Sequence, residues 1–212
     1  MHGTVVNVYS TEKLKELSPE EATNAINADI YENAWERQRE DRVAFKSGRP
    51  AEKLERAFVI CPGCGAAASL ISKGDSLSCP VCGFETHIDE YGFFADDKPF
   101  PTAHEWNEWQ KGAIRRMVND KSPAAKPVSG RLTLLDDKEK SRARTVEALA
   151  DTEKGRFIFG DMELAYSDIS DMSMVKTNRL LFTCESGYYE FKSKKGALRL
   201  FLLIWQAARD AI

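Results

Sequence analysis

Two short motifs in this chain combine residue types that bind metal ions. The segments Cys61–Gly65 and Cys79–Gly83 both read Cys-Pro-x-Cys-Gly, with 14 residues between Cys64 and Cys79. Two residues between paired cysteines let both thiolates face one ion from a tight turn, and the glycine permits the open backbone conformation that such a turn needs. Four thiolates complete the closed tetrahedral site that structural zinc prefers. The spacing predicts one structural Zn2+ bound by Cys61, Cys64, Cys79 and Cys82.

Other roles for these cysteines are alternatives to the zinc site. The four thiols could simply be buried, or they could form two disulfides. A redox pair is disfavoured because the βαβ context is absent, and a catalytic zinc needs an open coordination position that four cysteines do not leave. His87, five residues after Cys82, is a conceivable ligand, but a surface histidine is the simpler interpretation. We expect the metal to build structure and not to react.

Short strands and one amphipathic helix are expected to position the cysteines. From Ala57 to Ala95 the pattern indicates short β pieces, and Leu70–Leu77 reads as a hairpin around a glycine turn. Thr102 to Glu105 matches a capping box, which predicts a helix start. The apolar face of that helix consists of Trp106, Trp109, Ala113 and Met117.

A helical arm is expected before the cysteine motifs. Val5 to Val8 is a short β-like stretch, and Ser18, Pro19 and Glu21 then match a capping box with proline in the first turn. Apolar residues at helical spacing behind this box predict one helix that ends near Arg42. The apolar stripe consists of Ala22, Ile26, Ile30, Tyr31, Ala34 and Trp35.

The last 85 or so residues carry β signals and one apolar helix. A proline-rich linker at residues 122–127 precedes them. About seven strands follow, and the helix Lys194–Arg209 is apolar on most sides, so it must lie against a sheet or plug the end of a barrel. The strands are marked by Leu132 and Leu134, Ala143 to Ala150, Phe157 and Phe159, Leu164 and Tyr166, Met172 and Met174, Leu180 and Phe182, and, after a turn at Glu185–Gly187, Tyr189 and Phe191.

Composition narrows the class of protein. A chain of 212 residues with 42% hydrophobic and 10% aromatic content is typical of a folded protein. No apolar run approaches the roughly 20 residues that cross a bilayer, and no signal peptide is recognisable after Met1. Paired cysteines fit a reducing compartment. We expect a cytoplasmic protein, with any membrane contact peripheral and at the inner membrane face.

Nucleic-acid binding and catalysis find little support in the residues. The formal charge of the chain is −3, and between Ala57 and Ala95 the only basic side chain is Lys73, which is the wrong balance for phosphate contacts. The three histidines have no acidic partner at a recognisable spacing, and no nucleophile-elbow or phosphate-loop motif occurs. Cys184 is more simply a small core residue than a nucleophile. The sequence supplies no catalytic residue, so whether the chain belongs to an enzyme stays open.

Most of residues 1–120 resembles a C-terminal extension found in some bacterial 1-acylglycerol-3-phosphate (lysophosphatidate) acyltransferases. That family acylates with a His-x-x-x-x-Asp pair and binds glycerol phosphate through a Glu-Gly-Thr-Arg-like segment, and neither occurs here. The resemblance therefore implies an accessory region without the catalytic residues, with Val5–Val8 as the end of a catalytic sheet. It is carried by Ala51–Arg56, the two cysteine motifs, Tyr91–Phe94 and Trp106–Gln110, together with Tyr31, Trp35 and Gln38.

Residues 128–212 resemble a PH-like or GRAM-like domain in the order of their elements. The resemblance implies a seven-stranded, partly open barrel closed by the C-terminal helix. Many PH-like domains bind lipid head groups through the loop after the first strand, and here that loop mixes cations with acids. A solvated loop is the alternative to a lipid site. The candidate lipid-binding residues are Lys138, Lys140, Arg142 and Arg144.

The sequence thus predicts an α+β multidomain protein: a helical arm at 1–56 (a remnant of an acyltransferase end), a zinc ribbon with its amphipathic helix at 57–121, a linker at 122–127 and a PH-like domain at 128–212. The leading hypothesis is an accessory or regulatory region for phospholipid synthesis, whose partner is an acyltransferase catalytic domain or other protein and which has possible contact with an anionic lipid surface. One alternative is a free-standing adaptor that binds protein through Trp106, Trp109 and the sheet. The other is a nucleic-acid-binding ribbon.

Overall fold

The structure, a computed structural model, describes residues 5–95, 98–123, 126–135, 143–194 and 198–210. The chain divides into two compact units, Met1–Val43 and Ala44–Ile212. In the described ranges, no helix combines the length and the apolar character needed to cross a membrane.

The first unit contains three helices: α1 (Thr11–Glu16), α2 (Pro19–Ile30) and α3 (Ala34–Asp41). The expected capping box at the start of α2 is present, because Ser18 and Glu21 exchange hydrogen bonds between side chain and backbone.

The single helix expected from Ser18 to near Arg42 is wrong, because it is two helices. Tyr31 has an extended backbone, and the Asn33 side chain accepts a hydrogen bond from the Trp35 N–H at 3.0 Å. Asparagine is a strong N-cap. Ile26 and Ile30 are exposed, so little packing holds the continuous helix that their spacing suggested.

The β-like stretch at Val5 to Val8 forms no strand in the described part of the chain. All three valines are largely exposed, with Val8 at 86%. A strand is stable only when it pairs with others, so high β propensity does not by itself produce one here.

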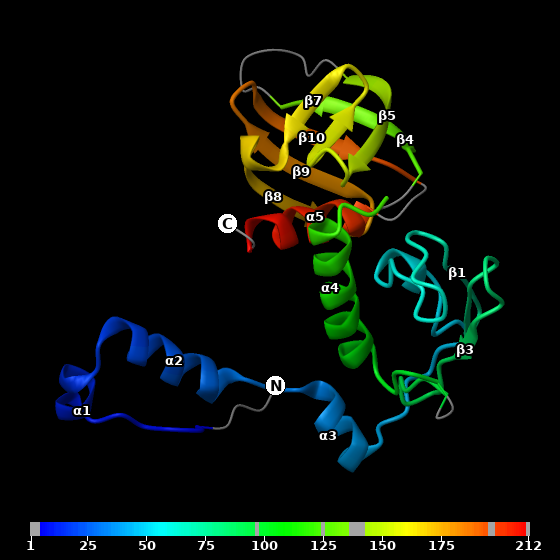
Figure 1. The fold of residues 1–212 in the computed structure, drawn as a ribbon. Helices are drawn as coiled ribbons and strands as arrows, with labels where there is room; N and C mark the ends of the chain where they lie inside the picture. The colour runs from blue at the N-terminus through cyan, green and yellow to red at the C-terminus, as the bar shows by residue number, and fades with distance from the viewer. Residues whose placement is uncertain (1–4, 96–97, 124–125, 136–142, 195–197, 211–212) are drawn as a thin grey trace. The chain divides into compact units, whose positions relative to one another are not determined.

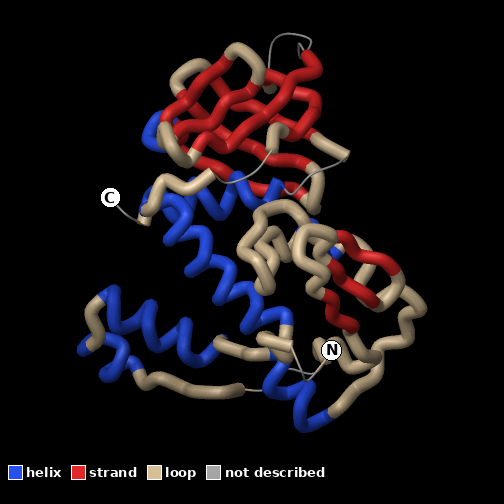
Figure 2. The backbone as a smooth tube through the Cα atoms, turned by 45° about the vertical axis from the view of Figure 1, so that its right-hand side comes forward, coloured by secondary structure: helices blue, strands red, loops and turns tan. Residues whose placement is uncertain are grey.

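The second unit begins with a cysteine module, residues 51–100, that contains little regular structure. After the short 3-10 helix η1 (Leu54–Arg56), three short strands form an antiparallel sheet in the order β1-β2-β3. The expected glycine turn is confirmed, because Gly74, with φ of +64°, joins the first two strands. Loops make up most of this module (Figure 2). The strands are β1 (Ile71–Lys73), β2 (Ser76–Ser78) and β3 (Glu85–His87).

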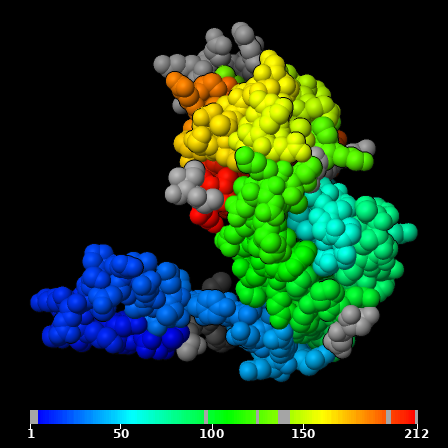
Figure 3. All heavy atoms as spheres, in the orientation of Figure 1, coloured from blue at the N-terminus to red at the C-terminus, as the bar shows by residue number. Residues whose placement is uncertain are grey.

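The helix α4 (Ala103–Asn119) packs against the cysteine module. Its predicted capping box is confirmed, since the Thr102 hydroxyl accepts from the Glu105 N–H and the Glu105 carboxylate accepts from the Thr102 N–H. Trp106 is buried and stacks on Phe58 with ring centroids 4.6 Å apart. In the space-filling view, the cyan atoms of the module lie directly on the green helix (Figure 3).

The rest of the second unit is a seven-stranded antiparallel sheet that curls into a half-barrel, with helix α5 at one end (Figure 1). Its strand order is β7-β6-β5-β4-β10-β9-β8, so the last strand pairs with the first. All seven strands expected from the alternation of apolar residues are confirmed. The strands are β4 (Val128–Leu134), β5 (Ala143–Asp151), β6 (Arg156–Phe159), β7 (Met162–Ala165), β8 (Ile169–Val175), β9 (Arg179–Cys184) and β10 (Gly187–Lys192).

The two edge strands of the half-barrel are consecutive in the chain. The 3-10 helix η2 (Tyr166–Asp168) connects β7 directly to β8. A register shift between Ile169 and Asp171 marks a bulge in β8. Helix α5 (Leu198–Arg209) lies against this end of the sheet, where Trp205 donates its indole N–H to the Ile169 carbonyl at 3.2 Å and Arg209 donates to the Ser170 carbonyl.

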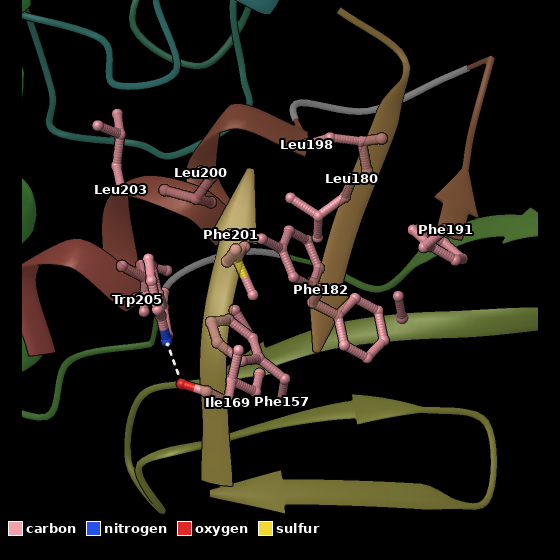
Figure 4. Packing of buried hydrophobic residues seen from close by; sticks show 14 of the residues in the cluster. Phe157, Ile169, Leu180, Phe182, Phe191, Leu198, Leu200, Phe201, Leu203 and Trp205 are labelled. Atoms are coloured by element: carbon pink, nitrogen blue, oxygen red, sulfur yellow. Dashed lines mark hydrogen bonds between the residues drawn. The ribbon is translucent and has the colours of Figure 1, made fainter. Parts of the chain in front are cut away.

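The core of the half-barrel is rich in phenylalanine. Phe159 stacks on Phe182 with centroids 4.7 Å apart. Phe201 of α5 stacks on Phe157, and Figure 4 labels both of these residues. The prediction that the last helix lies against the sheet is confirmed. This core extends through Ile114 of α4 to Val59 and Ile60 of the cysteine module, whereas the other buried apolar residues of the module form a second, smaller cluster.

Candidate metal centre

The four cysteines of the two motifs converge on one point. Their sulfur atoms all lie within 4.8 Å of one another. Cys61 Sγ is 3.7 Å from Cys82 Sγ, and Cys64 Sγ is 3.9 Å from Cys79 Sγ. Tetrahedral coordination with metal–sulfur bonds of about 2.3 Å gives sulfur–sulfur distances of about 3.8 Å. The cluster is therefore the right size for a single metal ion, and all four cysteines are free thiols and not cystines.

Backbone amides surround the sulfurs in the same way in both motifs. The Cys61 sulfur accepts hydrogen bonds from the N–H groups of Gly63 and Cys64. In the second motif, the Cys79 sulfur accepts from Val81 and Cys82. Each turn is closed by the glycine that follows it, with Gly65 N–H donating to the Cys61 carbonyl and Gly83 N–H to the Cys79 carbonyl.

Both closing glycines have a left-handed backbone, with φ of +72° at Gly65 and +75° at Gly83. This conformation is strained for residues with a side chain, which explains the glycine at the fifth position of each motif. The sequence prediction of two metal-binding turns therefore has a direct geometric basis.

The third position distinguishes the two turns. A Cβ atom at Gly63 would lie 3.1 Å from Cys82 Sγ and 3.1 Å from the Cβ of Phe84. Val81, at the same position of the second motif, is 66% exposed. A side chain at the third position is therefore tolerated in the second turn, whereas in the first turn it would crowd Cys82 and Phe84.

Burial and hydrogen bonding act on the thiols in opposite directions. Burial raises the pKa of the Cys61 thiol to about 12. Burial also acts to raise the pKa of Cys79, but hydrogen bonds from the Ser69 hydroxyl and from the N–H groups of Val81 and Cys82 outweigh it, and the pKa falls to about 6. Thiolates and not thiols bind metals, so the hydrogen bonds to Cys79 favour its metal-binding form, whereas burial disfavours that form at Cys61.

Ser69 is a component of the site that the sequence does not reveal. Its hydroxyl lies 3.3 Å from Cys79 Sγ and 3.1 Å from the Ala66 carbonyl oxygen, so its single proton is within reach of both acceptors. No motif marks this serine, because it approaches the cluster only after the chain has folded back between the two turns.

The cluster has one buried side and one open side. Cys61 and Cys79 are 0% and 1% exposed, whereas Cys64 and Cys82 are exposed. The first cysteine of each motif thus lies in the small apolar core around Leu77.

Gln110 of α4 fixes the segment that leads into the first turn. Its side chain is fully buried, accepts from the Val59 N–H at 3.0 Å and donates to the Ala57 carbonyl at 3.0 Å. The Gln110 amide thereby pairs with one backbone donor and one backbone acceptor of this segment, as a neighbouring strand would. Four residues before Gln110, and so on the same face of α4, the Trp106 indole N–H donates to the Ile60 carbonyl.

His87 and Cys184 lie outside the metal cluster. The His87 side chain is 57% exposed and lies near the carboxylates of Asp75 and Glu85, which confirms the interpretation as a surface histidine. Cys184 is buried in the half-barrel, where its sulfur contacts the Ser186 hydroxyl at 3.2 Å.

Three of the four candidate lipid-binding residues belong to a segment that the structure does not describe. Lys138, Lys140 and Arg142 lie outside the described residues. Arg144 is in β5 and forms an ion pair with Asp161 at 2.5 Å, so its charge is at least partly compensated.

The adaptor hypothesis named Trp106 and Trp109 as contact residues, and this choice is wrong for Trp106. Trp106 is 1% exposed, and Trp109 is half-buried between the module and the core of the half-barrel. Amphipathic spacing identified the apolar face correctly but did not show that the face is already covered.

The fold and the site together define a module with a four-cysteine cluster of the size of a metal site, followed by an antiparallel half-barrel. No protein-family model, curated protein or solved structure gives a significant match to this chain.

Proposed function

We propose that the four cysteines hold one structural zinc ion and that the chain is an accessory binding module and not a catalyst. The observation that carries this proposal is the convergence of four sulfurs at tetrahedral spacing. Four thiolates leave no open coordination position for a substrate or a reactive water. The ion contributes its binding energy to folding the module and fixes it on α4.

The sequence resemblance supplies the biological setting of the proposal. We infer an accessory or regulatory region of a phospholipid-synthesis acyltransferase of the 1-acylglycerol-3-phosphate type. In support, Phe94 and Trp106, two of the residues that carry the resemblance, contact each other beside the cysteine turns. Peripheral contact with the inner membrane face belongs to the same proposal.

The half-barrel is proposed to be PH-like. Its strand order, in which the seventh strand pairs with the first and a C-terminal helix covers one end, supports this assignment. A domain of this kind would position the partner enzyme or its substrate and would not act on the substrate itself.

A protein-interaction adaptor is the second candidate, and the arm favours it. Ile26, Ile30 and Tyr31 are 57%, 72% and 66% exposed, although their spacing is that of a buried helix face. On this view the arm, and not Trp106, would contact the partner.

Metal analysis and an acyl-transfer assay test the main proposal. We expect about one zinc per chain and no transfer of acyl groups from a thioester donor to lysophosphatidate. A tetrathiolate site also accepts iron, so a coloured, iron-containing protein would contradict the zinc assignment. Acyl transfer by the purified chain alone would overturn the non-catalytic role.

A binding assay separates the acyltransferase setting from the general adaptor. We expect the full chain to be retained on an immobilised lysophosphatidate acyltransferase and to lose that retention when zinc is removed. Retention on an unrelated protein but not on the acyltransferase would favour the adaptor.

A further inference from the structure

A concave pocket of about 660 Å³ lies on the half-barrel, outside the metal centre. It is lined by residues of β4, β9 and β10 and by the segments that follow β4 and β10. Its volume falls within the range of small-molecule sites. The charged lining consists of four basic side chains and one acidic side chain, namely Arg131, Arg179, Lys192, Lys194 and Glu190. Positive charge is therefore concentrated here, although the whole chain carries a formal charge of −3.

Strand register places three of these cations side by side. Lys192 of β10 pairs with Arg131 of β4 on one side and with Arg179 of β9 on the other. Neighbouring strands are about 4.8 Å apart. Like charges directly opposite each other destabilise a sheet, so the row is an electrostatic cost for the empty protein that a bound anion would remove.

Little of this positive charge is neutralised within the described residues. Arg179 forms an ion pair with Glu190 at 3.2 Å. In the ranges that the structure describes, Arg131, Lys192 and Lys194 have no ion pair with any carboxylate. At least three cations thus face the pocket without a protein counter-charge from that part of the chain.

The segment that carries the two lysines is held firmly. Between them, Ser193 is buried, donates its hydroxyl to the Ser129 carbonyl at 2.7 Å and donates its N–H to the Asn178 carbonyl at 3.1 Å. Arg56 of the cysteine module donates to the Lys194 carbonyl and to the Thr177 hydroxyl. Preorganised cations lose less conformational entropy when a ligand binds.

We propose that this pocket binds a small phosphate-bearing ligand. Arginine matches phosphate oxygens with a planar pair of donors, and lysine adds a point charge. Arg131 and Lys192 would contact the phosphate, and Lys194 would assist from the rim. The pocket is distinct from the loop cations considered earlier, and the proposal depends neither on the metal nor on the acyltransferase resemblance.

Calorimetric titration of the full, metal-loaded chain with inorganic pyrophosphate tests the proposal. We expect binding that weakens with salt, and a dissociation constant at least about tenfold higher for each cation removed in R131Q and K192Q, as for hydrogen bonds to charged groups. The double variant should melt no lower than the wild type, because it relieves repulsion between opposed cations. The matched control is K121Q/K154Q, which removes two exposed lysines outside the pocket.

Vesicles identify the source of the phosphate. Flotation uses phosphatidylcholine vesicles with and without phosphatidic acid. The pocket is assigned to a lipid headgroup if the wild type and K121Q/K154Q bind the phosphatidic acid vesicles and R131Q/K192Q does not. If the protein binds pyrophosphate but not these vesicles, the pocket is assigned to a soluble phosphate compound. The proposal is overturned if neither probe binds, or if the pocket variant and the control weaken binding equally.

Discussion

The cysteine module and the half-barrel reach a folded state by different physical means. In the module the three strands are three residues long, and the core is a few side chains around Leu77 and Trp106. The half-barrel has seven strands and a core that includes five buried phenylalanines, namely Phe157, Phe159, Phe182, Phe191 and Phe201. A segment as small as the module buries too little apolar surface to fold alone. The four cysteines converge in the region with the smaller apolar core, which is where cross-linking by the proposed metal would contribute most to stability.

Removal of one proposed metal ligand should show most clearly that the cysteine module and the half-barrel differ in what stabilises them. We expect C61S to lose the metal and, with it, apparent binding energy on the order of 10 kcal/mol. Hydrogen exchange of the backbone amides should then show loss of protection in β1–β3 but not in β4–β10. The control is C184S, which changes a buried cysteine outside the cluster and should keep the metal. Collapse of both regions together would show that the metal supports the whole unit.

The opposite perturbation removes apolar volume from the half-barrel. Phe159 is fully buried among other aromatic rings, so F159A should lower the free energy of unfolding of the half-barrel by about 3–5 kcal/mol. The metal content should stay at that of the wild type. Denaturant unfolding combined with metal analysis measures both quantities. The exposed aromatic Tyr188 provides the control, and Y188A should cost far less.

Gln110 connects α4 to the cysteine module, so its removal should weaken that connection. In Q110A the Val59 N–H and the Ala57 carbonyl lose their buried partner, which should destabilise the protein by about 2 kcal/mol. Chemical denaturation measures this change. The control Q206A alters an exposed glutamine on α5 with the same intrinsic helix preference. If Q110A and Q206A lowered the free energy of unfolding equally, the role assigned to Gln110 would be contradicted.

The smallest effect is expected at Ser69. In S69A the Cys79 thiol loses a hydrogen bond that helps to lower its pKa to about 6, so that pKa should rise. Protons then compete better at neutral pH, and metal affinity should fall up to about tenfold. The difference in metal affinity between S69A and the wild type should narrow as the pH rises, because the Cys79 thiol becomes deprotonated in both proteins. Chelator competition measured across pH tests this, and a deficit that does not change with pH would contradict the explanation.

The sequence predicted those features that depend on local patterns. Alternating apolar residues such as Phe157 and Phe159 marked most strands of the half-barrel, although Tyr166, expected in a strand, lies in η2, and the cysteine spacing marked the cluster. The break between α2 and α3 was missed because the apolar spacing of Ile26 and Ile30 continues across it. The break between these helices is set by cap residues and by the lack of packing, and not by apolar spacing.

Features that depend on distant parts of the chain could not be read from a single sequence. Ser69 and Gln110 belong to no motif, and their roles follow from folding that brings them to Cys79 and Val59. The row of Arg131, Lys192 and Arg179 requires strand order and register. A register different by one residue would move these side chains to the other face.

The contacts between α5 and β8 bear on how the protein avoids aggregation. An open edge strand offers unpaired carbonyl groups to a strand from another molecule. Here the carbonyls of Ile169 and Ser170 already accept hydrogen bonds from Trp205 and Arg209, and the bulge interrupts regular pairing at the same place. Helix α5 therefore blocks the pairing of a strand from a second copy of the chain with this end of β8.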